Sequence, residues 1–458
     1  ATLADNQVGT VGSNGLLVQV NSGSRLTTAI ARRNSIASAG GNGVLLAAQN
    51  GSQLTTALVE DAQVTQAGSN GVLVQADTGS TLNQATVVNS TVTQAGQNGV
   101  LVQADNGSQL QTATVTGGQV QAAGQNGVLV LANNGSQIQS ATVEQTQIGT
   151  PGAASTIASN GILVFADSGS SLSRALVQGN QLAAVGATGI QIFADGQSQL
   201  SNAQIRDNQL QAVSGGGILV FADGQSQLGD ATVANNAVSQ TGREGIQVFA
   251  DGSGQLGAIT VDGNQITQTT GNGIQVFAAN SGRIDAVQVS RNQLTTIGQD
   301  GIAAFAETSG SLPAVTLNDN QLSQVSQDGL RAFATNGGAV ETVTITDNQT
   351  QAVGSTGVFA FADGTSQLST LTLTNNQIQQ SGRHAVELGN EGSNDFCAVV
   401  ANNTSIATTD LDANLFATGT GALQVVDFPQ LSANNNNTFS QVNNAGATAG
   451  TAGVSPCS

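Results

Sequence analysis

The chain has 458 residues with a formal net charge of -18; only 8% of its residues are charged, and Met, Trp and Tyr are absent. All of the positive side chains are Arg, scattered along the sequence. Binding to nucleic acid or to an anionic membrane surface needs clustered Lys or Arg, so the composition disfavours both partners. No apolar run approaches the roughly 18 residues that span a bilayer, and we therefore expect no transmembrane segment.

The first residue and the two cysteines indicate an exported protein. The chain begins at Ala1 rather than Met, so we expect that a leader has been removed, although a boundary chosen for expression would look the same. Cys397 and Cys457 are the only cysteines, and both lie near the end of the chain. They could be inert thiols, but a disulfide between them fits an exported protein better.

A repeat with a constant period covers most of the chain. Each unit is anchored on a residue, almost always Gly, that precedes an apolar run. Every step between anchors is 28 residues except the step from Gly127 to Gly161, which is 34 because six residues are inserted within 149–160. Such a fixed period is typical of solenoid proteins. The anchors are Gly15, Gly43, Gly71, Gly99, Gly127, Gly161, Gly189, Gly217, Gly245, Gly273, Gly301, Gly329, Gly357 and Ala385.

Within a unit the apolar pattern has a period of two. After Gly217, for example, Ile218, Val220 and Ala222 alternate with Leu219 and Phe221, and two further alternating segments follow after turns. Three short strands per unit, repeated at constant length, predict an all-β parallel β-solenoid of about 14 coils.

The outward positions of the first strand change along the chain. In the early coils one outward position holds Leu, namely Leu17, Leu45, Leu73, Leu101 and Leu129. After the insertion the other outward position holds Phe, namely Phe165, Phe193, Phe221, Phe249, Phe277, Phe305, Phe333 and Phe361. An apolar strip of this length exceeds what a soluble monomer usually exposes, so we expect it to be an interface that is covered. The cover is the chain itself or a second copy; an extended polysaccharide is disfavoured because Trp and Tyr are absent.

One turn position holds Asn in eight consecutive coils. Asn tolerates the left-handed backbone of a sharp bend, and its amide can bond to the Asn of the next coil. We therefore interpret these residues as a structural ladder. They are Asn180, Asn208, Asn236, Asn264, Asn292, Asn320, Asn348 and Asn376, with Asn6 and Asn34 in the same place near the start.

The motif Val261-Asp-Gly-Asn264-Gln-Ile266, followed by Gly-Asn-Gly-Ile-Gln-Val, resembles the repeat of right-handed parallel β-helix proteins. This superfamily, with pectate-lyase-like enzymes, phage tailspikes and secreted bacterial adhesins, implies the fold without choosing among functions. The likeness covers about residues 1 to 390 and is closest in character to adhesins and surface solenoids. It implies an extracellular or cell-surface location in a bacterium.

In enzymes of that superfamily, catalysis lies on the outer face of the first strand and needs clustered carboxylates with Lys, Arg or His. Asp195, Asp223 and Asp251 follow this strand here, but each precedes Gly, as a turn residue would. We rank the turn role above weak calcium binding, and calcium binding above catalysis. Because Lys is absent and the strand face repeats without local exceptions, we expect no catalytic residue and no cofactor.

Three titratable side chains remain near the end of the repeat. Arg331 and Glu307 lie one coil apart and are expected to form a weak surface salt bridge. His384, the only His, is expected to be a surface residue rather than a ligand.

The repeat decays after residue 390, and we expect residues 391–458 to form an irregular segment that caps its own solenoid or docks on a neighbouring copy. The resulting hypothesis is an extracellular, non-enzymatic structural or adhesive solenoid that self-associates into a fibre or sheath. The alternative is a β-helix that binds or degrades polysaccharide, for which loss of activity in Asp223→Ala or Asp251→Ala would be the evidence.

Overall fold

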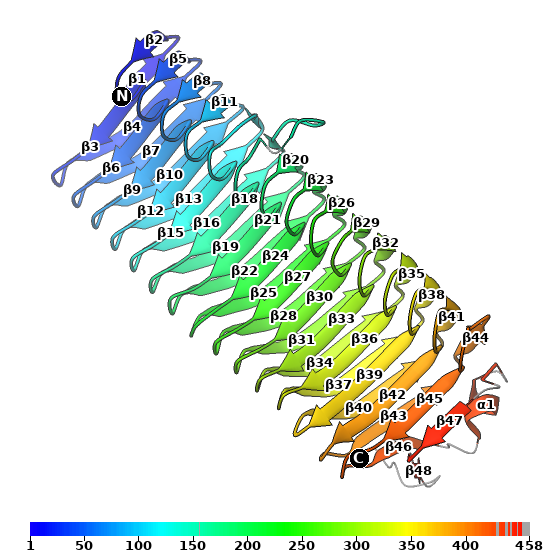
Figure 1. Cartoon of the computed structure of the whole chain (residues 1–458). Coiled ribbons are helices and arrows are strands. Elements are labelled where there is room, and N and C mark those ends of the chain that lie inside the picture. Colours follow the sequence, from blue (N-terminus) through cyan, green and yellow to red (C-terminus); the bar gives the residue numbers. More distant parts are fainter. Residues whose placement is uncertain (155, 427–429, 436–437, 440–441, 447, 451–458) are drawn as a thin grey trace. The chain divides into compact units, whose positions relative to one another are not determined.

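The computed structural model describes residues 1–154, 156–426, 430–435, 438–439, 442–446 and 448–450. It contains two compact units, Ala1–Ala231 and Thr232–Ser458, and the boundary falls within strand β25 (Gln227–Ala234). In each unit successive coils supply strands to three parallel ladders, which we call A, B and C (Figure 1). The predicted fold class, an all-β parallel β-solenoid, is therefore confirmed.

In the first unit each coil runs from ladder C through ladder A to ladder B. Ladder C consists of β3 (Leu16–Val20), β6 (Val44–Ala48), β9 (Val72–Ala76), β12 (Val100–Ala104), β15 (Val128–Ala132), β18 (Ile162–Ala166), β21 (Ile190–Ala194) and β24 (Ile218–Ala222). Ladder A consists of β1 (Thr2–Ala4), β4 (Arg25–Arg32), β7 (Gln53–Glu60), β10 (Thr81–Val88), β13 (Gln109–Thr116), β16 (Gln137–Glu144), β19 (Ser171–Gln178) and β22 (Gln199–Arg206). Ladder B consists of β2 (Gln7–Val11), β5 (Ser35–Ala39), β8 (Gln63–Ala67), β11 (Thr91–Ala95), β14 (Gln119–Val120), β17 (Gln147–Ile148), β20 (Gln181–Val185) and β23 (Gln209–Val213).

The second unit has the same order of strands. Its ladder C consists of β27 (Ile246–Ala250), β30 (Ile274–Ala278), β33 (Ile302–Glu307), β36 (Leu330–Thr335), β39 (Val358–Gly364), β42 (Val386–Gly392), β45 (Ala413–Ala417) and β47 (Val442–Ala445). Its ladder A consists of β28 (Gln255–Asp262), β31 (Arg283–Ser290), β34 (Ser311–Asn318), β37 (Ala339–Thr346), β40 (Gln367–Thr374), β43 (Phe396–Ala401), β46 (Leu423–Val426) and β48 (Thr448–Gly450). Its ladder B consists of β26 (Ala237–Thr241), β29 (Gln265–Thr269), β32 (Gln293–Ile297), β35 (Gln321–Val325), β38 (Gln349–Val353), β41 (Gln377–Ser381) and β44 (Thr404–Ile406), and a short helix, α1 (Leu431–Asn434), follows β46.

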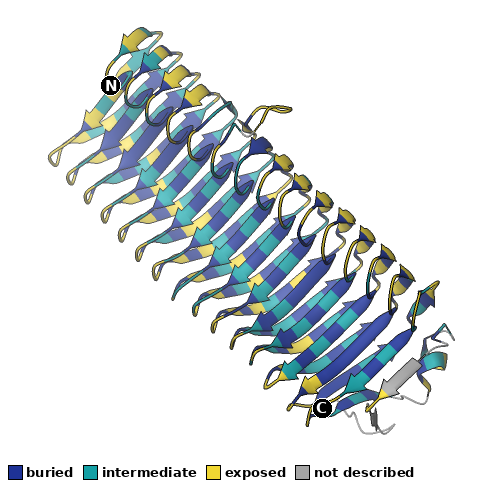
Figure 2. Ribbon diagram, in the orientation of Figure 1, coloured by how far each residue is buried: buried dark blue, intermediate teal, exposed yellow. Residues whose placement is uncertain are grey.

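The core is the interior of the coils, as the alternating pattern predicts. In β27, Ile246, Val248 and Ala250 are fully buried, whereas Gln247 and Phe249 are half-buried on the outer side. Figure 2 shows the same alternation as buried and intermediate bands along the strands of each unit. The strands pair in register, so that Ile246 lies beside Ile274 and Phe249 beside Phe277. Side chains at equivalent positions of successive coils therefore form continuous rows along a ladder.

The inserted residues form a loop that follows β17 of ladder B and precedes β18 of ladder C in the first unit (Figure 1). Pro151, Gly152, Ala153 and Ala154 are exposed in this loop. The parallel pairing resumes at Ile157, which bridges Ala123 in the previous coil and Val185 in the next. The insertion therefore interrupts the ladder B segment of one coil without shifting the register of the ladders.

The pairing continues beyond residue 390, which the sequence pattern does not predict. β43 pairs with β40, β45 with β42, and β44 with β41, all parallel. The described part of segment 391–458 thus adds strands to its own unit. Cys397 lies buried in β43, but Cys457 is outside the described residues, so the disulfide stays a prediction.

Candidate functional site

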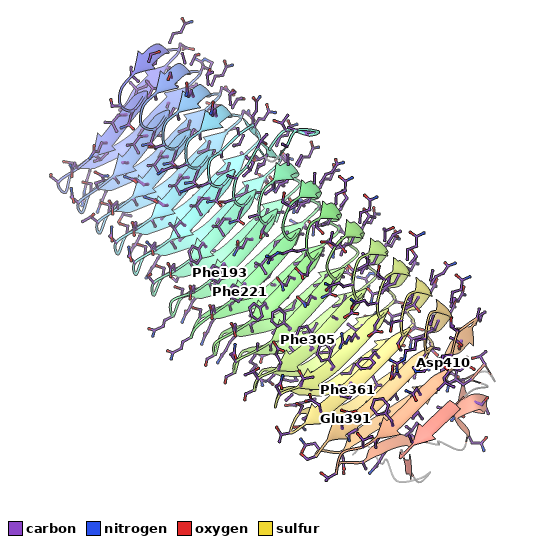
Figure 3. All side chains as sticks on the ribbon, in the orientation of Figure 1. Phe193, Phe221, Phe305, Phe361, Glu391 and Asp410 are labelled. Atoms are coloured by element: carbon purple, nitrogen blue, oxygen red, sulfur yellow. The ribbon has the colours of Figure 1, made fainter. Side chains whose placement is uncertain are left out.

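Seven Phe residues of ladder C form stacks of rings, which we call the Phe rank: Phe165, Phe193 and Phe221 in the first unit and Phe249, Phe277, Phe305 and Phe333 in the second. Phe361, which the sequence places in the same row, instead makes tilted contacts with Phe359 and Phe416, with ring centroids 5.8 and 6.3 Å apart. In the first unit the ring centroids of Phe165 and Phe193 lie 4.8 Å apart at an interplanar angle of 5°. In the second unit the Phe277 and Phe305 centroids lie 5.0 Å apart at 7°, and those of Phe305 and Phe333 lie 4.6 Å apart at 10°. Figure 3 shows Phe193 and Phe221, and Phe305, on the ladder C strands of their units. Since neighbouring rings cover each other's faces, all of these side chains are half-buried, and solvent meets mainly ring edges.

This geometry limits what the Phe rank can bind. A sugar ring stacks on the face of an aromatic ring, but both faces of Phe193, Phe277 and Phe305 are occupied by the neighbouring Phe. A row of ring edges instead suits contact with another apolar side-chain surface. The Phe rank therefore presents ring edges, rather than ring faces, on the outer side of ladder C.

The Leu positions in the first unit differ from the expectation of an exposed strip. Leu17 is 47% exposed, but Leu73 and Leu101 are each only 8% exposed, while Leu45 and Leu129 are half-buried. Identical side chains in successive coils cover one another, and the bonded Gln75 and Gln103 amides, 2.9 Å apart, occupy the neighbouring outward position. Leu73 and Leu101 therefore belong to the packed structure rather than to an exposed interface.

The Asn residues form the expected hydrogen-bonded ladder. They do not, however, adopt the left-handed backbone that was expected of them. The Asn264 Oδ1 accepts bonds from the backbone N–H and Nδ2 of Asn236, at 2.9 and 3.0 Å, while the Asn264 Nδ2 donates to the Val233 carbonyl at 2.9 Å. The left-handed residue is the one before the Asn, such as Gly263 with φ of 63°. The Asn itself is fully buried, so the position selects Asn for its bonds rather than for its backbone.

The Asp residues that follow the ladder C strands serve mainly as turn groups. The Asp195 and Asp223 Oδ1 atoms accept the backbone N–H of the next Gly, at 2.6 and 2.5 Å, and the Asp251 Oδ1 accepts the Asn280 Nδ2 at 2.7 Å. Within the described ranges, no group of three or more His, Cys, Asp or Glu side chains is placed to hold a metal ion. Calcium binding at these three residues stays an untested prediction.

A second polar ladder, at the corner before ladder C, was missed by the sequence analysis. In the first unit it consists of Asn14, Asn42, Asn70, Asn98, Asn126 and Asn160, joined by amide bonds such as Asn98 Nδ2 to Asn70 Oδ1 at 2.9 Å. The signal was present, since each of these residues directly precedes an anchor Gly.

In the second unit this corner ladder changes from Asn to charged residues. Asn272 is followed at the same position by Asp300, Asp328, Thr356 and His384. The backbone N–H of Asp328 donates to the Asp300 Oδ1 at 3.1 Å, and that of Thr356 donates to the Asp328 Oδ1 at 3.0 Å. The outer face of the first strand was expected to repeat without local exceptions; the corner directly before that strand does not repeat in this unit. We call Asp300, Asp328, Arg331, His384 and Glu387 the charged cluster.

Arg331 links the two Asp residues of the charged cluster to the aromatic rings. Its Nη1 lies 3.2 Å from the Asp300 Oδ2 and its Nε 3.9 Å from the Asp328 Oδ2, so the expected pair with Glu307 is wrong. Its guanidinium carbon lies 4.3 Å from the Phe333 ring centroid and 5.2 Å from that of Phe359. Burial raises the pKa of Asp300, while the charge of Arg331 opposes this rise.

Glu387 and His384 complete the charged cluster, and both are buried. The Glu387 Oε2 lies 3.2 Å from the Arg383 Nη1, and its Oε1 accepts the Asn414 Nδ2 at 3.1 Å. His384 is only 3% exposed, so the expectation of a surface residue is wrong. Its Nδ1 lies 3.6 Å from the Asp410 Oδ2, and burial lowers its pKa. The buried carboxylates of Asp300 and Glu387 thus each have an Arg partner, an arrangement typical of a structural ion network.

Comparison with known proteins supports the fold. A family model described as "Right handed beta helix region" matches residues 18–308 and 189–369. No curated protein matches the sequence. Among solved structures, one described as "Crystal structure of Agl-KA catalytic domain" is similar at 13% identity and a TM-score of 0.26, covering 77% of this chain and 62% of that one. A likeness at this score carries no argument about function.

Proposed function

Since the chain belongs to the right-handed β-helix family, whose members need not be enzymes, we propose that it is a structural or adhesive β-solenoid. We place it outside the cell or on its surface, exported by a bacterium, where copies associate into a fibre or sheath. Among the residues described, no helix is long and apolar enough to cross a membrane.

The observation that supports this proposal best is the Phe rank. Its rings are held in register by the strand pairing of ladder C, as Phe277 with Phe305 and Phe305 with Phe333. Within a Phe rank the rings recur once per coil, about every 4.8 Å. The rings on a second copy have the same spacing, so two Phe ranks that lie side by side match ring for ring. Burying ring edges against a second apolar rank removes them from water, which drives association.

The proposal is tested by replacing the four stacked rings of the second unit with Gln, as in Phe249→Gln, Phe277→Gln, Phe305→Gln and Phe333→Gln. Gln has a precedent at this position, since Gln75 and Gln103 occupy it in the first unit and bond to each other. Sedimentation velocity and negative-stain imaging should show concentration-dependent assemblies for the parent chain and monomers for the variant.

A matched control changes half-buried residues of ladder A instead, as in Thr260→Gln, Thr316→Gln and Thr344→Gln. This control should assemble like the parent chain, and circular dichroism should show that all three proteins are folded. Assembly of the Phe variant at the parental concentration, or a parent chain that stays monomeric at high concentration, would remove the proposal.

A second candidate function, polysaccharide degradation, is favoured by the charged cluster alone. Asp300 and Asp328 lie on successive coils beside Arg331, at the edge of the strand face that carries catalysis in enzymes of similar fold. The test measures release of reducing ends from neutral and acidic polysaccharides. Activity that is abolished by Asp328→Asn and retained in Asp223→Ala would favour this function, whereas absence of activity supports the structural one.

A further inference from the structure

The outer side of ladder A in the second unit carries a regular array of Thr side chains on β37 and β40. Each strand contributes three Thr residues at alternate positions, and strand pairing sets them side by side. We call these six residues the Thr net, and they pair as Thr342 with Thr370, Thr344 with Thr372, and Thr346 with Thr374. The middle row continues into β34, where Thr316 pairs with Thr344. The inward residues Val343 and Ile345 are fully buried, so the array stands on packed core.

Part of the hydrogen-bonding capacity of the Thr net is unused. In the described part of the chain, the hydroxyls of Thr342, Thr344 and Thr372 make no hydrogen bond to another protein group. Thr344 and Thr372 are half-buried, whereas Thr342 is exposed. Along one margin the Thr374 hydroxyl donates to the Thr346 hydroxyl at 3.3 Å. The middle row and Thr342 therefore present donors and acceptors to whatever lies on the net.

Backbone geometry fixes where these hydroxyls lie. Thr is branched at Cβ, which restricts χ1, so its hydroxyl and methyl groups follow the strand closely. Neighbouring strands of a sheet lie about 4.8 Å apart, and alternate residues of one strand lie about 6.6 Å apart. The Thr net is therefore a nearly rectangular net of small groups with these two spacings.

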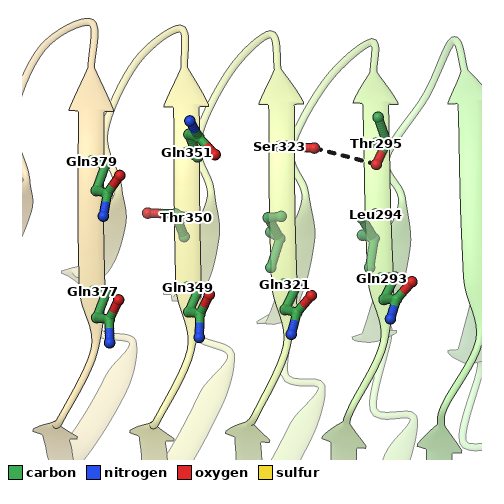
Figure 4. Close-up of a pocket in the computed structure, with 11 residues that line it drawn as sticks. Gln293, Leu294, Thr295, Gln321, Ser323, Gln349, Thr350, Gln351, Gln377 and Gln379 are labelled. Carbon is green, nitrogen blue, oxygen red and sulfur yellow. Dashed lines mark hydrogen bonds between the residues drawn. The ribbon is translucent and has the colours of Figure 1, made fainter.

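The outer side of ladder B in the same unit is also polar, but it is built differently. Figure 4 shows Gln293, Gln321, Gln349 and Gln377 in one row on four successive strands. A Gln side chain has several rotatable bonds and keeps much rotamer freedom at a surface, so its amide is not held at one point. Of these two faces, only ladder A presents rigidly placed small groups.

We propose that the Thr net binds the surface of ice. The oxygen atoms in a prism face of hexagonal ice form a rectangular net with similar spacings, so water molecules bonded to the Thr hydroxyls lie near lattice positions of ice. The entropic cost of holding such bridging water is small, and in ice that water is already immobilised. The Thr methyl groups between the hydroxyls leave liquid water at the contact. Glu341 and Asp347 flank the Thr residues of β37, which leaves the net itself uncharged, like the ice surface.

Thermal hysteresis and ice-crystal shape test this proposal. Nanolitre osmometry of the parent chain should show a gap between the melting and freezing points, and the ice crystals should grow facets. The double variant Thr344→Gln with Thr372→Gln should lower the hysteresis at least fivefold at equal protein concentration, because the longer side chains hold the rest of the net away from the ice. Gln already occupies this row at Gln288, which pairs with Thr316, so the variant should keep the parental circular dichroism spectrum.

The matched control is Thr295→Gln with Ser323→Gln, which replaces two bonded hydroxyls on the outer side of ladder B and should keep the parental hysteresis. A parent chain that shows neither hysteresis nor crystal shaping, equal hysteresis in the Thr344 and Thr372 variant, or an equal loss in the control would overturn the inference. The result is separable from the proposed self-association, because the Thr344 and Thr372 variant should still assemble and the Phe variant should still shape ice crystals.

Discussion

At the scale of single residues, the buried amides of the Asn ladder contribute most clearly to stability. We expect Asn264→Ala to lower the free energy of unfolding by about 3 kcal/mol or more, since each buried group left unpaired costs about 1–3 kcal/mol. The unpaired groups would include the Asn236 backbone N–H and the Val233 carbonyl. Urea denaturation and hydrogen exchange of β28 and β29 would measure the loss.

The control for this prediction is Gln367→Ala, in which an exposed amide loses its bond to the Ser369 hydroxyl. Exposed hydrogen bonds compete with water, so this change should shift the urea midpoint very little. Similar losses in both variants would show that burial of the ladder is not what stabilises it.

The buried His384 should make stability depend on pH. Burial lowers its pKa below the ordinary value of 6.5, so the unfolded chain binds a proton more readily than the folded chain does. The stability that the neutral, buried His384 contributes to the fold is therefore fully present above about pH 6.5, and it is lost as the pH falls below that value. Asp300, whose pKa is raised from 3.8, acts in the opposite sense, because the folded chain gains stability as that carboxyl is protonated.

Comparing the parent chain with His384→Asn in urea at pH 5, 6, 7 and 8 tests this expectation. Asn occupies the same corner position at Asn272, which makes it a suitable neutral replacement. The parent chain should lose more stability than the variant between pH 7 and pH 5. Parallel pH profiles for the two proteins would contradict the assignment to His384.

Features of single residues were predictable from the sequence where they keep the 28-residue spacing, and were not predictable where they depart from it. The spacing alone predicts the Phe rank and the Asn ladder, because parallel in-register strands place every equivalent residue side by side. The partners of Arg331 were not predictable in this way, since its guanidinium reaches a corner residue three positions before the facing strand residue Ala303. The contact of His384 with Asp410 was likewise not predictable, because Asp410 lies after residue 390, where the 28-residue repeat no longer holds.

At the scale of strands, the anchor Gly is required by close contact between coils. A Cβ atom added to Gly273 would lie 2.3 Å from the Leu294 Cδ2 and 2.6 Å from the Gly301 carbonyl oxygen. We expect Gly273→Ala to destabilise the second unit by about 2 kcal/mol or more, because the strand must move to relieve this overlap. Thermal denaturation would measure the change. Gly9→Ala, where no atom lies within 4 Å of the added Cβ, should have little effect.

The sequence pattern predicted that the repeat ends at residue 390, whereas the structure continues the strand pairing beyond it. The bonded ladder continues from Asn376 to Asn403 and on to Asn435, but the steps are 27 and 32 residues rather than 28. A search for one fixed period does not detect such steps, although the Asn residues keep their role. After residue 390 the turns vary in length while the strands keep their pairing, and a sequence pattern based on a fixed period does not reveal this.

At the scale of the whole molecule, the net charge of -18 opposes the association that the Phe rank is proposed to drive. Like-charged molecules repel over roughly 30 Å at 0.01 M salt but only about 10 Å at 0.1 M. Apolar contact is not weakened by screening, so raising sodium chloride from 20 to 500 mM should favour assembly. Sedimentation velocity at fixed protein concentration should show larger species at the higher salt, and the Phe variant should remain monomeric throughout. Dissociation at high salt would instead indicate contacts made by ion pairs, such as those of the exposed Arg residues, and would count against an apolar interface.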